Sequence, residues 1–443
     1  MRTMRNDLLL GERFGIVRRL ERRPMPPHFP RSYTIVDSYL CDTSRFCGFP
    51  SDTAGAGYAF AGTTEDAGGA AVAAAIGEAV ERYCGHLVPP GLTTASHAEL
   101  VAAGRAAVDP RSLALFSAEQ YTEPGFPCVP MTRDLPMAWA DGTDLATGAA
   151  VLVPANLVWI DPAPPLTNPI VQAGLATGPS PAAARWNALR EVIERDAMTL
   201  TWTGRGLLRL VRPPRRLARL GAGPVGVLQT RFYAFPNEVD LPVIGALVTD
   251  PTSGYLAMGM GVHPDPHQAM LKALGEAFQL HLLLADYDDP DGAFARAAGH
   301  ATSPLRAWRR DRDYADAYRD DLSDVRDYGC HLQLHLDPRI QHRFETELAT
   351  VVTGTVDPAD LAVGGPADLT ATVTRLAALG HQVISVDVTT ADIRRTGLHV
   401  LRVLVPGYHT NSAAGLPLLG GTRLAGCLAD GPDPRPRLLP LPH

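Results

Sequence analysis

One short helical phrase occurs three times in this chain, and each copy carries two polar side chains at the same spacing. The copies read AIGEAVER at residues 75–82, ALREVIER at residues 188–195 and ALGEAFQL at residues 273–280. Each copy places a glutamate three residues before a second glutamate or a glutamine, and such positions share one face of a helix. Three separated segments with the same acidic face predict one polar site built by several helices.

These helices offer a set of carboxylate and amide side chains to a common ion or ligand: Glu78, Glu81, Glu191, Glu194, Glu276 and Gln279. Arg82 and Arg195 follow the first glutamate of their phrases by four residues, the spacing of ordinary helix ion pairs worth roughly a few tenths of a kcal/mol. Such ion pairs are the simplest interpretation of either helix alone. The same two arginines are also placed to supply positive charge to a bound phosphate.

The first of these helices favours a ligand-binding role, because its other residues are almost all alanine and valine. A helix that is apolar all round is buried, and a carboxylate on a buried helix must meet a cation. The three helices together bring more negative charge than a few arginines neutralise. We therefore expect Mg2+ carrying a polyphosphate, because Mg2+ is held by carboxylate oxygens together with substrate phosphates.

Charge and lysine content argue against three classes of site. A net charge of −7 argues against a protein that binds nucleic acid by neutralising its phosphates. Lys272 is the only lysine, and it stands in no glycine-rich phosphate loop, so any ATP must be held differently from a Walker-type site. The position of Lys272 inside an expected helix also argues against Schiff-base chemistry.

The residues predict neither a signal peptide nor a membrane span. Residues 1–23 are rich in arginine without a long apolar core, and no stretch approaches about 20 uninterrupted apolar residues. The 6 cysteines form no Cys-x-x-Cys pair, and we expect ordinary reduced thiols. A cytoplasmic protein is the expectation.

Local patterns predict a mixture of strands and helices along the whole chain. Ser180 and Pro181 are expected to open the second acidic helix as N-cap and first helical residue. The charged stretch 286–328 is expected to run over the surface, and residues 432–443 to form an extended proline-rich tail. The other expected elements are a strand at 31–40, a Gly/Ala-rich loop at 55–69, a helix at 69–87, a strand at 149–160, a hairpin at 241–262, a helix after Pro266, helices at 369–379 and 391–396, and strands at 383–388 and 399–405.

Five motifs in order resemble those of the YcaO family. They are EAVERY at residues 78–83, ALREVIERDA at residues 188–197, EAFQ at residues 276–279, the segment Asp387–Gly407, and Gly15-Ile16-Val17 near the start. The resemblance runs from about residue 10 to residue 425. It implies a single large α+β domain of mixed sheets with packed helices, in which the repeated acidic helices surround a nucleotide site. The implied divisions are an N-terminal extension at 1–30, a catalytic domain at 31–425 and a proline-rich tail at 426–443.

The resemblance also implies a function, because members of the family use ATP and Mg2+ to activate a backbone amide of a ribosomally made peptide. Cyclodehydration of Cys, Ser or Thr to an azoline is the commonest outcome. Carried over residue by residue, the resemblance assigns the metal to Glu78, Glu81, Glu191 and Glu194. It assigns phosphate to the same four glutamates and the nucleotide to Glu276 and Gln279. Because the chain has only one lysine, we add Arg82 and Arg195 to the expected nucleotide site as sources of positive charge. No catalytic residue is assigned.

Three departures from the family pattern concern the chemistry. Ala74 stands where a serine is usual, and either Gly55-Ala56-Gly57 or Gly62-Thr63-Thr64 takes the place of a frequent Gly-Lys-Gly loop. Azoline-forming members end in a proline-rich tail that enters the active site, but here the run ending at Pro436 is followed by further residues up to His443. We still expect the segment 440–443 to dock near the acidic helices.

These departures leave alternatives open. The same activation could form a macrocyclic amidine or a thioamide, and a non-catalytic scaffold that kept the fold is a further hypothesis. The expected partner is a precursor peptide. Because no separate peptide-recognition domain is evident, a leader-binding partner protein is also considered, as is a homodimer.

Overall fold

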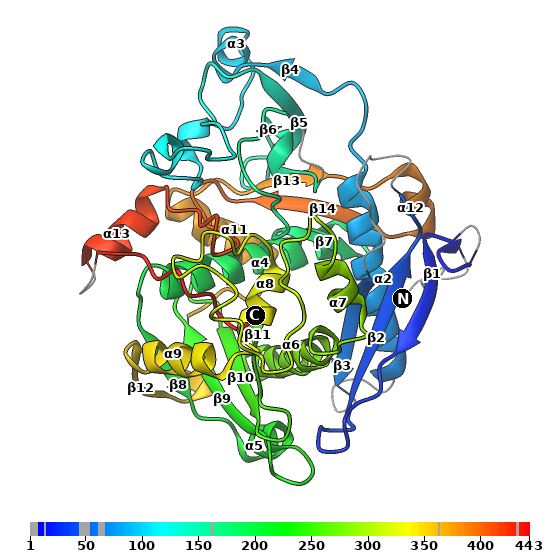
Figure 1. The fold of residues 1–443 in the computed structure, drawn as a ribbon. Helices are drawn as coiled ribbons and strands as arrows, with labels where there is room; N and C mark the ends of the chain where they lie inside the picture. The colour runs from blue at the N-terminus through cyan, green and yellow to red at the C-terminus, as the bar shows by residue number, and fades with distance from the viewer. Residues whose placement is uncertain are drawn as a thin grey trace.

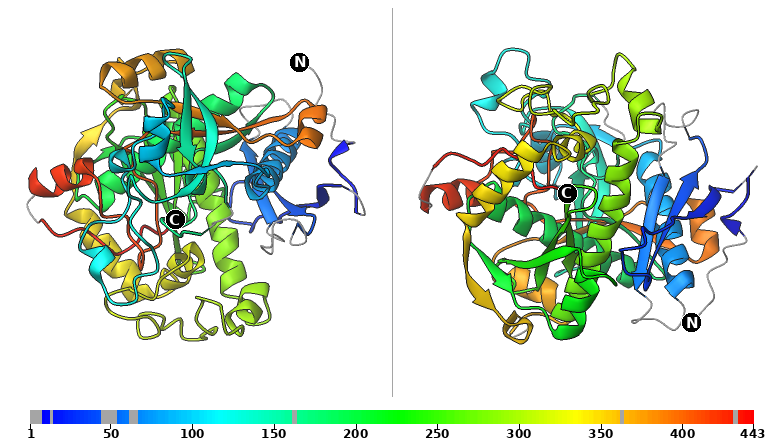
Figure 2. Two further views of the ribbon diagram at one scale, coloured as in Figure 1. Left: turned by 90° about the horizontal axis from the view of Figure 1, so that it is seen from above. Right: turned by 60° about the horizontal axis from the view of Figure 1, so that its bottom comes forward.

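The computed structural model describes residues 8–12, 15–43, 54–60, 67–160, 164–361, 364–430 and 434–443. Its strands form three separate sheets, of three, five and six strands, with helices packed on and between them (Figure 1). Two further views show the same arrangement from above and from below (Figure 2). This mixed architecture confirms the α+β prediction.

The first sheet is antiparallel in the order β1-β2-β3 and carries the first acidic helix. Its strands are β1 (Val17–Arg22), β2 (Tyr33–Leu40) and β3 (Ala54–Phe60). Helix α2 (Ala67–His86) packs on β2 and β3 with Ala71, Ala75 and Ile76 fully buried. The loop expected at 55–69 is therefore wrong where β3 and α2 lie, because small residues can pair in a strand beneath a closely packed helix; residues 61–66 lie outside the described part.

The second sheet has the order β11-β10-β9-β8-β12, and its first two strands form the predicted hairpin. Strand β12 runs parallel to β8, and the other pairs are antiparallel. A side-chain carbon at Gly259 would lie 2.2 Å from Ala273 O and Ala277 N, so glycine lets the third acidic helix, α6, approach β11 closely. The elements are β8 (Leu208–Val211), β9 (Gln229–Phe235), β10 (Val243–Asp250), β11 (Tyr255–Val262), β12 (Val352–Val356) and α6 (Pro266–Tyr287).

The third sheet has the order β4-β5-β13-β14-β7, with β6 paired to β5. The second acidic helix, α4 (Pro181–Trp202), packs on β7 and β14. Ser180 caps it through its side chain and Pro181 follows, as predicted. The strands are β4 (Thr93–Ala95), β5 (Met137–Asp144), β6 (Ala150–Pro154), β7 (Leu175–Gly178), β13 (Ile384–Asp387) and β14 (His399–Leu404).

The remaining helices are short and surround the three sheets. Single 3-10 turns occur at Pro110–Ser112, Gln120–Thr122 and Ala155–Leu157. The α-helices are α3 (His97–Ala102), α5 (Arg215–Ala222), α7 (Ala293–Ala298), α8 (Tyr328–Leu334), α9 (Pro338–Ala349), α10 (Pro358–Leu361), α11 (Leu369–Ala378), α12 (Ala391–Thr396) and α13 (Thr422–Asp430).

Two expectations about local structure differ from the structure. The strand expected at 149–160 ends at Pro154, where the backbone turns into a 3-10 helix. The stretch 286–328 is not confined to the surface, because its aromatic and aliphatic residues, including Tyr314, Leu322 and Val325, are buried in the main core. The many charged residues of this stretch were the reason to expect the whole segment at the surface.

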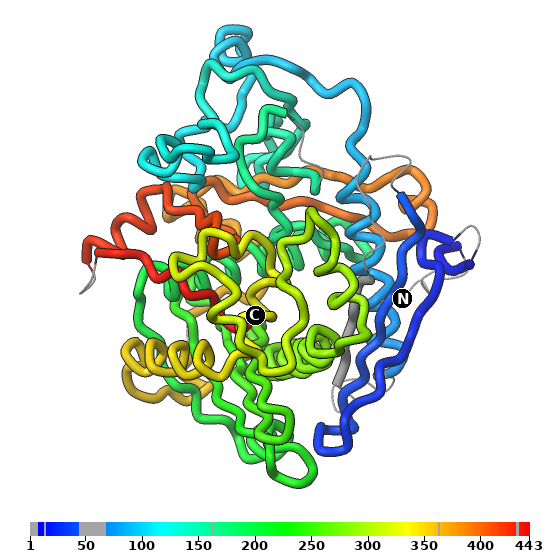
Figure 3. Tube along the Cα trace, viewed as in Figure 1, coloured from blue at the N-terminus to red at the C-terminus, as the bar shows by residue number. Residues whose placement is uncertain are grey.

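The tail is part of the packed structure. After α13 the chain runs inward and ends beside β11, where the C label stands (Figure 3). Leu439 and Leu441 are buried in the largest apolar cluster, together with residues of α4 and β11.

The domain divisions at residues 30 and 425 remain a prediction. Among the described helices, none has both the length and the apolar composition needed to cross a membrane.

Candidate nucleotide and metal site

The three acidic helices meet although each rests on a different sheet. Helix α2 packs on the first sheet and touches β7 of the third, and α4 packs on the third sheet and touches β11 of the second. Helix α6 packs on the second sheet and touches β3 of the first. This cyclic arrangement brings together five carboxylates, which we call the acidic cluster: Glu78, Glu81, Glu191, Glu194 and Glu276.

Arg195 lies in the middle of the acidic cluster. Its Nη2 is 3.4 Å from the Glu194 carboxylate and 3.9 Å from that of Glu276, and its Nε is 4.0 Å from Glu191. Although burial opposes its charge, these glutamates raise the pKa of Arg195. One cation thus serves three carboxylates.

Backbone amides orient two of the carboxylates. Gly174 N donates to Glu191 Oε2 at 3.0 Å, and Met260 N on the edge strand β11 donates to Glu276 Oε2. Gly174 has φ +85°, and a side-chain carbon there would lie 2.5 Å from Val403 O, so this turn requires glycine. The other oxygen of each carboxylate, Oε1, lies within 4.0 Å of Arg195.

Glu78 and Glu81 of α2 differ in their partners. Glu78 forms the i, i+4 ion pair with Arg82 at 2.9 Å, so the simple ion-pair interpretation holds for this arginine. Glu81 has no ion pair or hydrogen bond with any residue that the structure describes, and it lies near Glu78 and Glu191. An unpartnered carboxylate beside two others is a place for a cation.

Burial and crowding act on the protonation of the cluster. Burial raises the pKa of Glu191 and of Glu194 to about 7, against the attraction of Arg195. Burial, followed by the charge of Glu78, holds the pKa of Glu81 well above its usual range. A divalent cation would favour the charged carboxylates. No group of three metal-binding side chains is close enough to enclose a metal within the described ranges, so ligands such as phosphate oxygens would have to complete the coordination.

A cavity of about 300 Å3 opens beside the cluster, and its wall includes cations that the sequence motifs did not single out. Burial and Arg190 lower the pKa of Lys272 to about 8, and Lys272 forms no ion pair with described residues. Arg190 Nε is buried without a hydrogen-bond partner among them. The cavity is lined by Asn187, Arg190, Glu191, Glu194, Met260, Gly261, Val262, Lys272 and Glu276.

Helix spacing could have found these additional residues. Asn187 and Arg190 precede Glu191 and Glu194 by one turn, and Lys272 precedes Glu276 by one turn, so each shares the acidic face of its helix. The Glu-x-x-Glu and Glu-x-x-Gln patterns by themselves do not include these positions.

Two predicted positions contribute less to the cluster. Gln279 lies one turn beyond Glu276 on α6, and no hydrogen bond or ion pair joins its side chain to the cluster in the described structure. Ala74, in place of the usual serine, is exposed one turn before Glu78 on α2. The structure therefore brings together seven of the eight predicted nucleotide-site residues: Glu78, Glu81, Arg82, Glu191, Glu194, Arg195 and Glu276.

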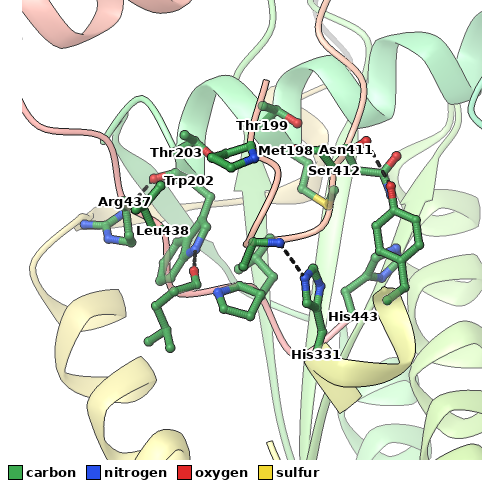
Figure 4. Close-up of a pocket in the computed structure, with 16 residues that line it drawn as sticks. Met198, Thr199, Trp202, Thr203, His331, Asn411, Ser412, Arg437, Leu438 and His443 are labelled. Carbon is green, nitrogen blue, oxygen red and sulfur yellow. Dashed lines mark hydrogen bonds between the residues drawn. The ribbon is translucent and has the colours of Figure 1, made fainter. Parts of the chain in front are cut away.

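A second cavity, of about 70 Å3, lies along the docked tail (Figure 4). It is bounded by α4, by α8 and by the loop after β14, with Met198, Thr199, His331 and Asn411 in its wall. His443 lines this cavity and also contacts the cluster, since its Nε2 accepts a hydrogen bond from Arg195 Nη1. The prediction that residues 440–443 dock near the acidic helices is confirmed.

Comparison with known proteins agrees with this geometry. Residues 62–409 match the family model described as YcaO cyclodehydratase, ATP- and Mg2+-binding. An uncharacterised protein in the tfuA 3′ region of Rhizobium leguminosarum bv. trifolii is 27% identical over 239 residues, covering 48% of this chain and 52% of that protein. The chain spans about half the length of the curated relatives that it matches.

Solved structures show the same fold. A heterocyclase in complex with substrate and cofactor superposes with a TM-score of 0.66 at 19% identity, covering 95% of this chain and 53% of that one. YcaO from Methanopyrus kandleri bound with AMPPCP and Mg2+ has a TM-score of 0.59 at 22% identity, covering 91% and 88%. ATP and Mg2+, the cofactors expected from the sequence, are those of the matched family. With most of its length in that family model and three acidic helices joined in one cluster, the chain belongs to the YcaO family.

Proposed function

We propose that this chain is an ATP-dependent enzyme that activates a backbone amide of a ribosomally made peptide and converts Cys, Ser or Thr residues to azolines. The observation that carries the proposal is one cavity whose wall holds both carboxylates and cations without full partners. Glu191 and Glu194 line this cavity together with Lys272 and Arg190, whose Nε has no hydrogen-bond partner among the described residues. Such a wall matches a metal ion and the phosphates attached to it.

The residues assigned to the cofactor keep those roles as part of the proposal. Glu78, Glu81, Glu191 and Glu194 would hold Mg2+, with the unpartnered Glu81 the best placed to accept it. Lys272 and Arg190 extend the nucleotide site predicted from the sequence, which comprises Glu78, Glu81, Arg82, Glu191, Glu194, Arg195, Glu276 and Gln279. When bound, ATP with Mg2+ supplies a phosphoryl group, so that the amide oxygen leaves as phosphate and the peptide loses the equivalent of one water per ring.

The chain's own residues orient the acidic face of α4 and neutralise the negative charge of the bound phosphates. Asn187 fixes the start of the acidic face, because its Nδ2 donates to Thr177 O at 3.1 Å and its Oδ1 accepts from Arg190 at 2.5 Å. Lys272 and Arg195 place positive charge where the phosphates would lie. Both cations are largely enclosed, and a site shielded from water strengthens these interactions.

The second cavity is the proposed entry for the peptide, because it meets the cluster at His443. The wall of this cavity includes His331. His331 Nε2 accepts the Ala414 N–H at 3.0 Å, which assigns the ring proton to Nδ1 and leaves that N–H available to a peptide carbonyl. Burial lowers the pKa of His331 to about 3, so the ring is neutral at physiological pH.

Isothermal titration with Mg2+ and AMPPCP, followed by mass spectrometry of candidate precursor peptides incubated with ATP, tests the proposal. Loss of one water per modified residue supports azoline formation. Exchange of oxygen for sulfur would identify a thioamide-forming enzyme, and loss of water with an internal amine joined would identify an amidine. Failure to bind the nucleotide would overturn the enzyme assignment in favour of a scaffold. A separate leader-binding protein and a homodimer remain proposals.

A further inference from the structure

The position of Arg195 determines how much negative charge the acidic cluster can offer to a metal. In the described structure its guanidinium reaches the carboxylates of Glu191, Glu194 and Glu276 at 3.4–4.0 Å. The same oxygens are those proposed to face Mg2+ and its phosphates. Arg195 and Mg2+ are therefore competing counter-ions, and any group that draws the guanidinium away from the carboxylates favours the metal.

His443 provides such a group. Its Nε2 accepts a hydrogen bond from Arg195 Nη1, while its Nδ1 lies 3.1 Å from Met258 O on the edge of β11. The contact with a carbonyl oxygen assigns the ring proton to Nδ1, so Nε2 is an acceptor with its lone pair toward Arg195. Both ring nitrogens are thus engaged, which fixes the orientation of the imidazole. The same Nδ1 is also 4.0 Å from the Glu276 carboxylate.

The residues before His443 hold it in place without contacting the cluster. Three donors bind tail carbonyls: the Trp202 indole to Leu439 O at 2.6 Å, His335 Nε2 to Pro440 O at 2.9 Å, and Met258 N to Pro442 O at 2.7 Å. These contacts depend on the backbone of the tail and not on the His443 side chain. Changing that side chain therefore leaves the anchoring contacts intact.

We propose that His443 is a positioning residue for Arg195 and that this contact sets the affinity of the acidic cluster for Mg2+. With the acceptor present, Nη1 of Arg195 is occupied by the imidazole. Without it, the guanidinium turns fully onto the glutamates and neutralises the carboxylates that the metal needs. This inference rests on the proposed function, because it concerns the same metal site.

Two substitutions separate the contact with Arg195 from the docking of the tail. In His443→Asn the side-chain amide takes the place of Nδ1, so it keeps the donor to Met258 O but loses the acceptor for Arg195. In His443→Gln the side-chain oxygen reaches the place of Nε2 and retains the acceptor. We expect the Asn variant to bind Mg2+ with AMPPCP about five- to tenfold more weakly, the loss of one charge-assisted hydrogen bond, and the Gln variant to bind about as the unaltered protein.

Isothermal titration calorimetry measures these affinities, and hydrogen exchange of residues 434–443 shows whether the tail stays docked. Equal affinities in the unaltered protein and the Asn variant would overturn the inference, as would a Gln variant as weak as the Asn variant. An Asn variant whose tail exchanges freely would also count against it, because the contacts of Trp202 and Met258 are argued to suffice. If the unaltered protein binds no Mg2+ with the nucleotide, the proposed function itself fails; if it binds and only the variants contradict expectation, the positioning role alone fails.

Discussion

The indole N–H of Trp202 donates a hydrogen bond to the carbonyl oxygen of Leu439, with 2.6 Å between the two atoms. Trp202 is the last residue of α4, the helix that also carries Glu191 and Glu194. The Arg437 guanidinium lies over the same indole ring, 4.3 Å from its centre. The end of the second acidic helix is therefore the main anchor of the tail.

Replacing Trp202 with phenylalanine should release this anchor. The change leaves the buried Leu439 carbonyl without a partner and is expected to lower the free energy of unfolding by about 1–3 kcal/mol. Urea denaturation measures the loss, and hydrogen exchange should show reduced protection of residues 434–443. Trp308→Phe is the matched control, because that indole donates to Asp288 O and not to a tail carbonyl, so its loss should leave tail protection unchanged.

Glu81→Gln and Glu194→Gln should each abolish peptide-dependent phosphate release while the fold is retained. Each change removes one negative charge from the proposed metal site with little change in side-chain volume. A phosphate-release assay measures turnover, and circular dichroism shows whether the fold is retained. The exposed Glu123→Gln variant should behave as the unaltered protein. Turnover retained in both cluster variants would show that these carboxylates are structural.

Lys272→Met tests the cation that lines the acidic cavity. We expect about ten- to hundredfold weaker binding of AMPPCP with Mg2+, since one charged contact to phosphate is lost. Lys272→Arg keeps the charge and should recover part of the affinity. Calorimetry compares the variants. Unchanged affinity in the Met variant would remove Lys272 from the nucleotide site.

The raised pKa values of Glu191 and Glu194 predict an opposite pH dependence for the free and the Mg2+-bound protein. Between the unfolded value of 4.5 and the folded value of about 7, the native state holds protons that the unfolded state has lost, so stability falls as pH rises. Mg2+ binds the ionised carboxylates, so its stabilising effect should grow over the same range. Melting temperatures with and without Mg2+ at about pH 6 and about pH 8 check this. Equal or larger Mg2+ stabilisation at the lower pH would contradict it.

Deleting residues 440–443 should reduce peptide cyclisation roughly tenfold or more while nucleotide binding stays measurable, because the deletion removes the contacts at Pro442 and His443 but none of the glutamates. Mass spectrometry measures the cyclised product, and calorimetry with AMPPCP measures nucleotide binding. Undiminished cyclisation would favour amidine or thioamide chemistry over azoline formation.

Periodic segments were the parts of the fold that the sequence predicted well. The three acidic helices, the Ser180 cap and the hairpin of β10 and β11 follow from local patterns, and the structure has each of them. The acidic helices predicted Mg2+ with a polyphosphate, and the family resemblance identified the polyphosphate as ATP. These features depend on neighbours in sequence or on motifs of a few residues, which one chain displays directly.

Contacts between distant segments could not be predicted from the sequence. Nothing local indicates that Gly174 N would orient Glu191, or that Met260, Gly261 and Val262 of β11 would line the cavity beside the acidic cluster. The burial of Tyr314 within a charged stretch likewise depends on the core that it meets. Sheet membership and cavity walls arise from long-range packing, which local propensity does not encode.

The cyclic packing of α2, α4 and α6 has a consequence for how the protein opens. Each helix is well supported by its own sheet, whereas the junction among the three holds carboxylates that repel one another. In the metal-free protein this junction should be the first cooperative unit to separate, before any sheet loses its strands. A ligand bound at this junction would hold α2, α4 and α6 together. The rigidity of the whole molecule would therefore increase as the site is occupied.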